Sequence, residues 1–214
     1  DEMFVNSTGW KDIFRDFVDG GFNDGPNAGL DPVGLARGYA VPSVSTVTLP
    51  WINMDQIKLT FSADVGASID SNGSDFTLTG LFGYDSNGAP VTAPTITGAI
   101  WDGPSKTVTL QLSGPMGPNK YVVTALAAGI MTPGGGTLVG GDIQRTMHVN
   151  PGDAVGTPVL GASVVDGQDS TFIRNRLTGE LLDLPGNNIY DGAYFAYDVR
   201  ADINGDGKIS GADS

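Results

Sequence analysis

The chain has 214 residues, a length that suits one β-sandwich with a small appendage or two small domains. It contains no cysteine, which excludes disulfides, thiol catalysis and cysteine-based zinc sites. Eleven Lys and Arg against 24 Asp and Glu give a net charge of −13, which argues against nucleic acid and anionic lipid as partners and suits divalent cations. On composition alone, acidity serves solubility equally well. No run of 18 apolar residues occurs, so no membrane span is expected.

The N-terminal segment predicts a short strand and then a helix. Residues 3–5 are apolar, and a helix is expected over about residues 10–18, with Ser7 or Thr8 as its cap. Its side chains at intervals of four and three residues form one apolar stripe, consisting of Trp10, Phe14 and Phe17.

Two glycines, Gly20 and Gly21, are expected to end this helix. A segment rich in Gly, Asn and Asp then runs to about Val41. Such a loop is long for a compact domain, so we expect it either to be functional or to pack as an extended lid.

From residue 50 the hydrophobic period changes to two, as expected of half-buried strands. Strands are expected at about residues 57–61, 76–81, 107–112, 121–125 and 147–149. Turn-forming residues separate them at positions 70–73, 85–88, 114–115 and 133–136. Short strands divided by such turns indicate an antiparallel sandwich.

Three runs carry a resemblance to a known family. Residues 55–65 (DQIKLTFSADV), 105–112 (SKTVTLQL) and 119–124 (NKYVVT) resemble the bacterial Ig-like domains of surface and S-layer-associated proteins. More narrowly, residues 49–57 (LPWINMDQI), downstream of Gly38-Tyr39-Ala40, resemble a module of planctomycete secreted proteins that ends in a dockerin-like tail. This resemblance covers most of residues 1–150.

The clearest motif lies at the C-terminus, in residues 202–213 (DINGDGKISGAD). Side-chain oxygens fall at alternate positions, and Gly207 stands at position 6, where a calcium loop turns sharply. The predicted calcium ligands are Asp202, Asn204, Asp206, Lys208 through its carbonyl, Ser210 through its hydroxyl or a water, and Asp213. Calcium takes six to eight oxygens, and Ile209 at position 8 is expected to turn into the core. The alternative is a cluster of plain β-turns.

Position 12 holds Asp where the ordinary EF-hand has Glu, and in this the loop resembles a dockerin loop. A dockerin carries two loops, each followed by a helix. Residues 165–170 (VDGQDS) match residues 209–214 (ISGADS), and Asp169 is expected to cap a helix with Ile173 and Leu177 on one face. We expect this first copy to have lost its metal; the alternative is a distorted site of Asp153, Asp166 and Asp169.

The helix that should follow the second loop is missing, because the sequence ends at Ser214. This would leave the apolar face of the first helix poorly covered. Either the chain is cut or trails into disorder, or a neighbouring subunit supplies the cover in an end-to-end assembly.

No catalytic set stands out. The single His148 lies on a predicted strand, where an outward polar position is the ordinary role, and no Gly-x-Ser-x-Gly elbow occurs. Among 24 acidic residues, no spacing singles out a glycosidase pair. The tryptophans Trp10, Trp51 and Trp101 suit either a sugar-stacking platform or the core, and we favour the core. No enzyme is predicted.

The predicted fold is mainly β. We expect an N-terminal helix-containing segment packed on the sandwich (residues 1–44), an Ig-like antiparallel β-sandwich (45–150) and a dockerin-like, EF-hand-type calcium-binding tail (151–214). The tail has a degenerate first loop and lacks the second helix.

The predicted function is that of a non-catalytic, secreted or cell-surface structural or adhesion protein that binds Ca²⁺. It acts through protein assembly, with self-assembly into filaments or a surface layer. Two alternatives stay open: a dockerin-type attachment region of a larger secreted enzyme, with a cohesin-like scaffold as partner, or a carbohydrate-binding module with a polysaccharide partner.

Overall fold

The computed structural model describes residues 2–18, 38–41, 48–83, 92–138, 140–154, 165, 167–182, 192–194 and 197–213. Its strands are β1 (Glu2–Asn6), β2 (Tyr39–Val41), β3 (Thr48–Leu49), β4 (Gln56–Thr60), β5 (Phe76–Phe82), β6 (Ile96–Asp102), β7 (Thr107–Leu112), β8 (Asn119–Ala125), β9 (Ile143–Val149), β10 (Glu180–Leu182) and β11 (Gly192–Tyr194). Its helices are α1 (Asp12–Val18) and α2 (Gly167–Arg174), with 3-10 turns η1 (Gly66–Ser68) and η2 (Val199–Ala201).

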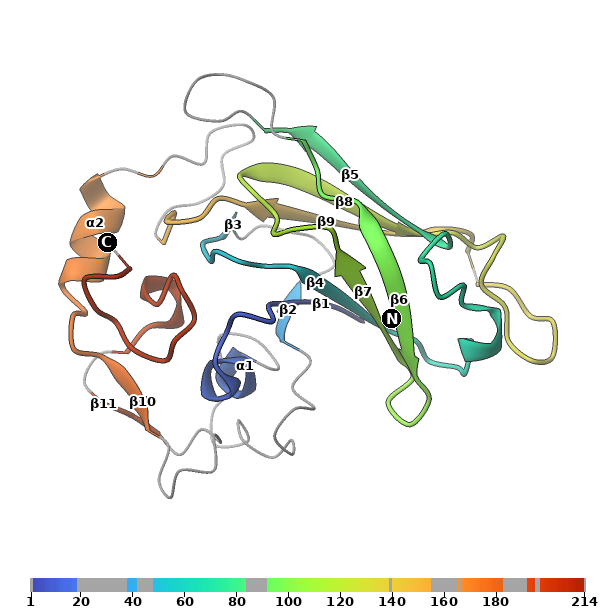
Figure 1. The fold of residues 1–214 in the computed structure, drawn as a ribbon, viewed down its shortest axis with the longest axis horizontal. Helices are drawn as coiled ribbons and strands as arrows, with labels where there is room; N and C mark the ends of the chain where they lie inside the picture. The colour runs from blue at the N-terminus through green and yellow to red at the C-terminus, as the bar shows by residue number, and fades with distance from the viewer. Residues whose placement is uncertain are drawn as a thin grey trace.

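Two sheets pack face to face, and the tail lies at one end of them (Figure 1). The first sheet has the order β2-β1-β4-β7-β6, with every neighbouring pair antiparallel. The second has the order β3-β9-β8-β5, in which β3 runs parallel to β9 and the other pairs are antiparallel. The predicted mainly β sandwich is confirmed.

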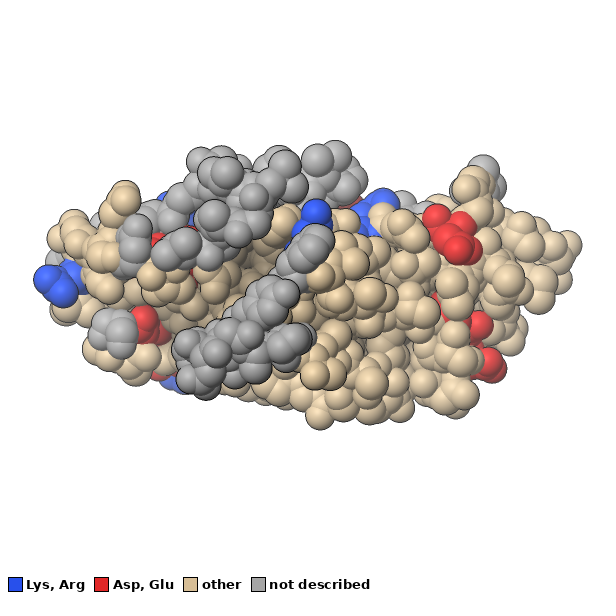
Figure 2. Space-filling model, turned by 90° about the horizontal axis from the view of Figure 1, so that it is seen from above, with Lys and Arg blue, Asp and Glu red and all other residues tan. Residues whose placement is uncertain are grey.

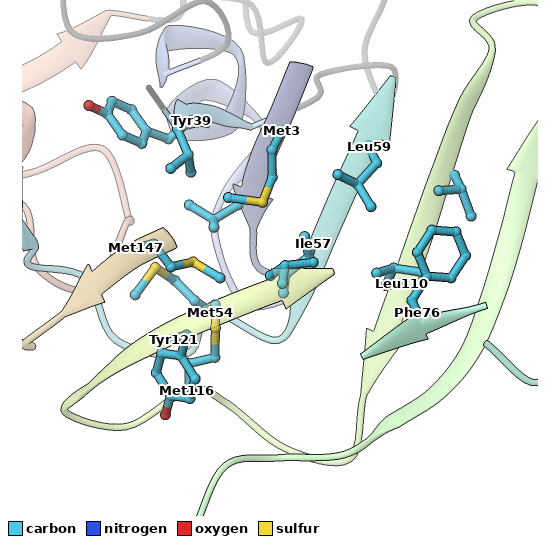
Figure 3. Close-up of a cluster of buried hydrophobic side chains, with 14 of the residues drawn as sticks. Met3, Tyr39, Met54, Ile57, Leu59, Phe76, Leu110, Met116, Tyr121 and Met147 are labelled. Atoms are coloured by element: carbon cyan, nitrogen blue, oxygen red, sulfur yellow. The ribbon is translucent and has the colours of Figure 1, made fainter. Parts of the chain in front are cut away.

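The inward-facing side chains of both sheets form one core (Figure 3). On β4, Ile57 and Leu59 are buried and alternate with half-buried polar residues, and they pair with Leu110 and Val108 of β7. The second sheet contributes Tyr121 and further residues from the opposite side. Burying each such side chain contributes about 1.5–3 kcal/mol, so the alternation predicted from the sequence accounts for the stability of the sandwich.

The predicted apolar strand at residues 3–5 is confirmed as β1, but the predicted helix begins later than expected. The helix α1 starts at Asp12, and the N–H groups of Phe14 and Arg15 donate to the Lys11 carbonyl. The predicted caps are wrong because both residues bond elsewhere: Ser7 Oγ accepts from Gly9 N, and Thr8 donates to Asp55.

The N-terminal segment forms part of the sandwich. Strand β1 lies between β2 and β4 in the first sheet, so it is held by hydrogen bonds on both sides. The expected loop over residues 20–41 ends in a strand, β2, and its residues 20–37 lie outside the described residues. The expected turn at 85–88 and the expected boundary near residue 45 also fall outside them.

The tail has a small core of its own. Its buried members are Ala154, Ile173, Ala201, Ile203 and Ile209, and Phe172 and Tyr197 pack against them. Ile173 of α2 is therefore covered within the chain, whereas Leu177 lies beyond the helix end and is 41% exposed. The expectation that these two residues share a helix face is wrong, and the uncovered apolar face expected on this helix is not observed.

None of the helices that the structure describes has the length and apolar character needed to cross a membrane.

Candidate functional site

The site predicted from the sequence is the C-terminal loop, residues 202–213, which follows η2 and packs against β10. Backbone hydrogen bonds join its second half to the residues around β10: Ile209 N donates to Gly179 O (2.8 Å), Thr178 N to Ile209 O (3.0 Å) and Leu181 N to Gly207 O (2.8 Å). The loop is thereby held as an added strand segment beside the β10–β11 hairpin (Figure 1).

Asp202, the first loop residue, is completely buried, with 0% of its surface exposed. Its Oδ1 accepts from the N–H groups of Gly205 (2.9 Å) and Asp206 (3.1 Å). Its Oδ2 accepts from Gly207 N (2.8 Å) and from the hydroxyl of Tyr197 (2.6 Å). One carboxylate thus organises the first six residues of the loop.

The other predicted side-chain ligands also turn their oxygens inward, onto the loop's own backbone. Asn204 Oδ1 accepts from Asp206 N, and Asp206 Oδ1 accepts from Lys208 N, both at 2.9 Å. Asp213 closes the loop, because its Oδ1 accepts from Asn204 N (3.2 Å) and its Oδ2 from Ser210 N (2.9 Å). The Ser210 hydroxyl accepts from Ala212 N (3.1 Å).

Lys208 behaves differently from these residues. Its ammonium pairs with Glu180 of β10 at the surface. The predicted calcium ligand of Lys208 is its backbone carbonyl oxygen, and the ion pair of the side chain does not involve this atom.

Glycine occupies the two positions where the loop backbone turns most sharply. Gly205 has φ +71° and Gly207 has φ +82°, in the left-handed region that side chains disfavour. Ile209 then turns into the tail core, as predicted from its place at position 8. These features follow from the local sequence pattern.

The loop concentrates negative charge in a buried place. The pKa of Asp202 is raised to about 7, chiefly by burial. The hydrogen bond from Tyr197 opposes the rise, and the carboxylates of Asp213 and Asp206 contribute to it. Burial also raises the pKa of Tyr197 well above its ordinary value, as do these same carboxylates. Within the described part of the chain, no Lys or Arg forms an ion pair with the three loop aspartates.

The donor atoms of the loop are of the kind that calcium binds: three carboxylates, one amide oxygen, one hydroxyl and one backbone carbonyl. Among the residues described, no group of three or more His, Cys, Asp or Glu side chains converges as a metal site. The reason is visible in the hydrogen bonds above, since each loop carboxylate faces backbone N–H groups. The loop residues thus match a calcium loop in type and in order along the chain, while their carboxylates bond the loop backbone and do not converge on one point.

The degenerate first copy packs beside this loop, because Ala154 and Ile173 share the tail core with Ile203 and Ile209. Asp153 is buried at the turn after β9, and Asp169 is buried in the first turn of α2, inside the helix and not before it as a cap. Asp166 lies outside the described residues.

Sequence reasoning missed two residues that contact the loop. Tyr197 donates to Asp202, and Trp10 of the N-terminal segment lies against Gly205. Neither follows from a periodic pattern, because the first belongs to an irregular stretch and the second is distant in the sequence.

The residues considered for catalysis and sugar binding take structural places. His148 lies half-buried on β9, where burial lowers its pKa, as does the charge of Lys120. Trp10 and Trp51 are buried in the core at a centroid distance of 5.5 Å, which removes them from a sugar-stacking surface. Trp101 packs against Phe61.

No protein-family model and no curated protein matches the chain. Two solved S-layer structures are similar over about half of it. They are the surface layer protein SbsC, domains 1–6 (TM-score 0.33, 16% identity, 51% of this chain and 14% of that chain) and the S-layer protein rSbsC(31–844) (TM-score 0.32, 16% identity, 51% and 14%). The chain thus spans 14% of the length of each, and neither match carries a function to it.

Proposed function

We propose that this chain is a non-catalytic, calcium-binding structural protein of the cell surface or extracellular space that acts through protein assembly. The observation that supports calcium binding is Asp202, a fully buried carboxylate with Asp206 and Asp213 close enough to raise its pKa. The ligands we propose are Asp202, Asn204, Asp206, Lys208 (carbonyl), Ser210 and Asp213.

Calcium supplies the positive charge that the three loop aspartates lack among the described residues. Three neighbouring carboxylates repel one another, and a divalent cation between them converts this repulsion into attraction. Oxygen ligands at alternate positions, with glycine at position 6, are the arrangement that wraps a loop around such an ion. An affinity in the range of about 10⁻⁴–10⁻³ M, common in extracellular modules, is enough for a protein in millimolar calcium.

Calorimetric titration of the chain with calcium tests this part of the proposal. At one hundred times its dissociation constant, calcium stabilises the folded state by about 2.7 kcal/mol. Asp206→Ala should abolish the heat of binding and the calcium-dependent rise in the melting temperature of the tail. Gln111→Ala, at an exposed polar side chain on β7, is the control and should leave both unchanged. Absence of heat with the unaltered chain rejects calcium binding.

The distribution of charge supports assembly end to end. Acidic side chains gather at the end of the sandwich away from the tail (Figure 2). The exposed acidic residues on the turns and strand ends there are Asp64, Asp70, Asp102 and Asp142. The last strand pairs of both sheets lie at this end. They are Thr60–Thr107 and Asp102–Thr107 in the first sheet, and Phe76–Ala125 and Ala125–Ile143 in the second.

The tail at the opposite end carries a cluster of arginines. Arg176 and Arg200 both lie over the ring of Phe172, with guanidinium carbons 3.6 Å and 4.9 Å from its centroid. Asp198 pairs with both of them, so one carboxylate serves two guanidinium groups, and Arg174 is exposed nearby on α2. Three arginines thus gather beside one carboxylate, within a tail that is acidic as a whole.

Contact between the arginine cluster of one copy and the acidic end of the next joins unlike surfaces. Repeated, such a head-to-tail contact builds an open filament. Sedimentation and electron microscopy in calcium should show polymers that high salt dissolves, because exposed charges are screened beyond a Debye length of about 8 Å at physiological ionic strength.

Arg174→Glu and Asp64→Lys test this contact with charges at opposite ends. Each variant alone should need a higher protein concentration to polymerise, and a mixture of the two should recover part of the loss. A strict monomer under every condition rejects self-assembly and leaves calcium binding standing. Attachment to a cohesin-like scaffold stays a prediction that a binding assay with such a domain decides.

A further inference from the structure

The N-terminal helix packs directly on the C-terminal loop. Lys11 N donates to the carbonyl oxygen of Gly205 at 3.0 Å. A Cβ added to Gly205 would overlap the indole ring of Trp10, so backbone and ring lie in close contact. A Cβ added to Gly207 would lie 3.2 Å from Cγ2 of Ile13. The turn that Asp202 organises is thus covered by the start of α1.

A second set of contacts links this turn to the sandwich. Ile52 N donates to Ile203 O (3.1 Å), and Trp10 Nε1 donates to Ile52 O (3.2 Å). Trp10 therefore touches the loop through its ring and the β3–β4 connection through its N–H. It also packs edge-on against Trp51, which belongs to the core between the sheets.

A third contact reaches the proposed calcium ligands themselves. Phe17, at the end of α1, packs edge-on against Tyr197 with ring centroids 5.5 Å apart. The Tyr197 hydroxyl in turn donates to Asp202 at 2.6 Å. Both ends of α1 are thus connected to Asp202, one through the glycine turn and the other through this tyrosine.

We infer that α1 with Trp10 is the packing partner of the loop, in the place of a second helix, and that calcium binding and the attachment of α1 to the tail are coupled. This inference rests on the proposed calcium binding. The atoms that face α1 belong to Gly205 and Gly207, whose N–H groups bind Asp202. The same backbone conformation is needed to present the ligands and to receive Trp10 and Ile13.

Coupling of this kind is reciprocal: a change that weakens the α1 contact must weaken calcium binding by the factor by which calcium strengthens the contact. The loop with calcium bound then holds α1 and the tail together. Since α1 of the same chain covers this side of the loop, no neighbouring subunit is needed to cover Gly205 and Gly207.

Ile13→Ala tests the coupling without altering any proposed ligand. We expect it to weaken calcium binding several-fold in a calorimetric titration. Ile100→Ala, at an exposed isoleucine on β6, is the matched control and should bind calcium as the unaltered chain does. Equal affinity for the two variants overturns the inference.

Trp10 supplies an independent readout. In a Trp51→Phe, Trp101→Phe background, calcium should change the emission of Trp10, because the turn beneath its ring becomes ordered. Gly205→Ala should remove this change, since the added Cβ collides with the ring. Gly211→Ala, in the same loop with nothing within 4 Å of its added Cβ, should retain it.

The outcomes separate the two proposals. If calcium binds with measurable heat but Trp10 emission does not respond and Ile13→Ala binds normally, the coupling is wrong and calcium binding stands. If no variant and not even the unaltered chain binds calcium, both proposals fall together.

Discussion

Replacing Asp202 with alanine should unfold the tail while leaving the sandwich intact. The carboxylate accepts hydrogen bonds from the N–H groups of Gly205, Asp206 and Gly207 and from the Tyr197 hydroxyl. Alanine removes all four acceptor contacts at a position that is 0% exposed. The N–H groups of Gly205 and Gly207 and the Tyr197 hydroxyl would then lose this partner, whereas Asp206 N keeps its bond to Asn204 Oδ1.

The magnitude follows from the cost of such donors. Each buried donor without a partner costs about 1–3 kcal/mol, and neighbouring losses are not additive, so we expect about 3–5 kcal/mol in total. Relief of repulsion between Asp202 and the carboxylates of Asp206 and Asp213 offsets a part of this loss. Among the described residues, the tail core has five buried apolar side chains, so a loss of this size is large for it.

Hydrogen exchange of the backbone amides measures the effect region by region. Protection should disappear at Ile209 and Leu181, whose amides bond the loop to β10, and persist in β4 and β7. Asp64→Ala is the control, because its exposed carboxylate accepts a single bond. If Asp202→Ala kept protection at both tail amides, the central role given to this carboxylate would be refuted.

Three further predictions follow from single contacts. Tyr197→Phe should cost about 1.5–3 kcal/mol of unfolding free energy in the tail, measured by denaturant titration, because it deletes one hydrogen bond to a carboxylate and keeps the ring. Ile209→Ala should cost about 2–5 kcal/mol in the same assay, because it opens a cavity in the tail core. Burial lowers the pKa of His148, so below its ordinary pKa the unfolded chain binds more protons than the folded chain. The unaltered chain should therefore lose stability relative to His148→Gln as the pH falls from neutral to about 5, and parallel pH profiles would contradict this.

The sandwich was predictable wherever its strands alternate. In β4 and β7 apolar residues at every second position face the core, and the structure places both strands where the pattern predicts them. Strand β6 was missed because its buried positions are Gly98 and Ala99, while Ile100 is 56% exposed. A register shift between Ile96 and Gly98 further breaks the period.

The C-terminal loop was predictable because its contacts are local. The backbone N–H groups that donate to Asp202 lie three to five positions after it, so the spacing of the motif determines these bonds, whereas the bond from the Tyr197 hydroxyl was not predicted. The contact between Trp10 and Gly205 has no such signal. It depends on the sandwich bringing α1 and the β3–β4 connection to one end of the molecule, which only the tertiary structure establishes.

The energetics of the two parts of the molecule explain why an ion should act on one and not on the other. The sandwich core is apolar and extends through both sheets, so its stability does not depend on the charges of the loop. In the tail a small apolar core stabilises the folded state, whereas the buried carboxylate of Asp202, whose pKa is raised to about 7, destabilises it when charged. A cation that contributes about 2.7 kcal/mol at one hundred times its dissociation constant is decisive for such a balance. Calcium should therefore order the tail and its contact with α1, while the melting of the sandwich stays nearly independent of it.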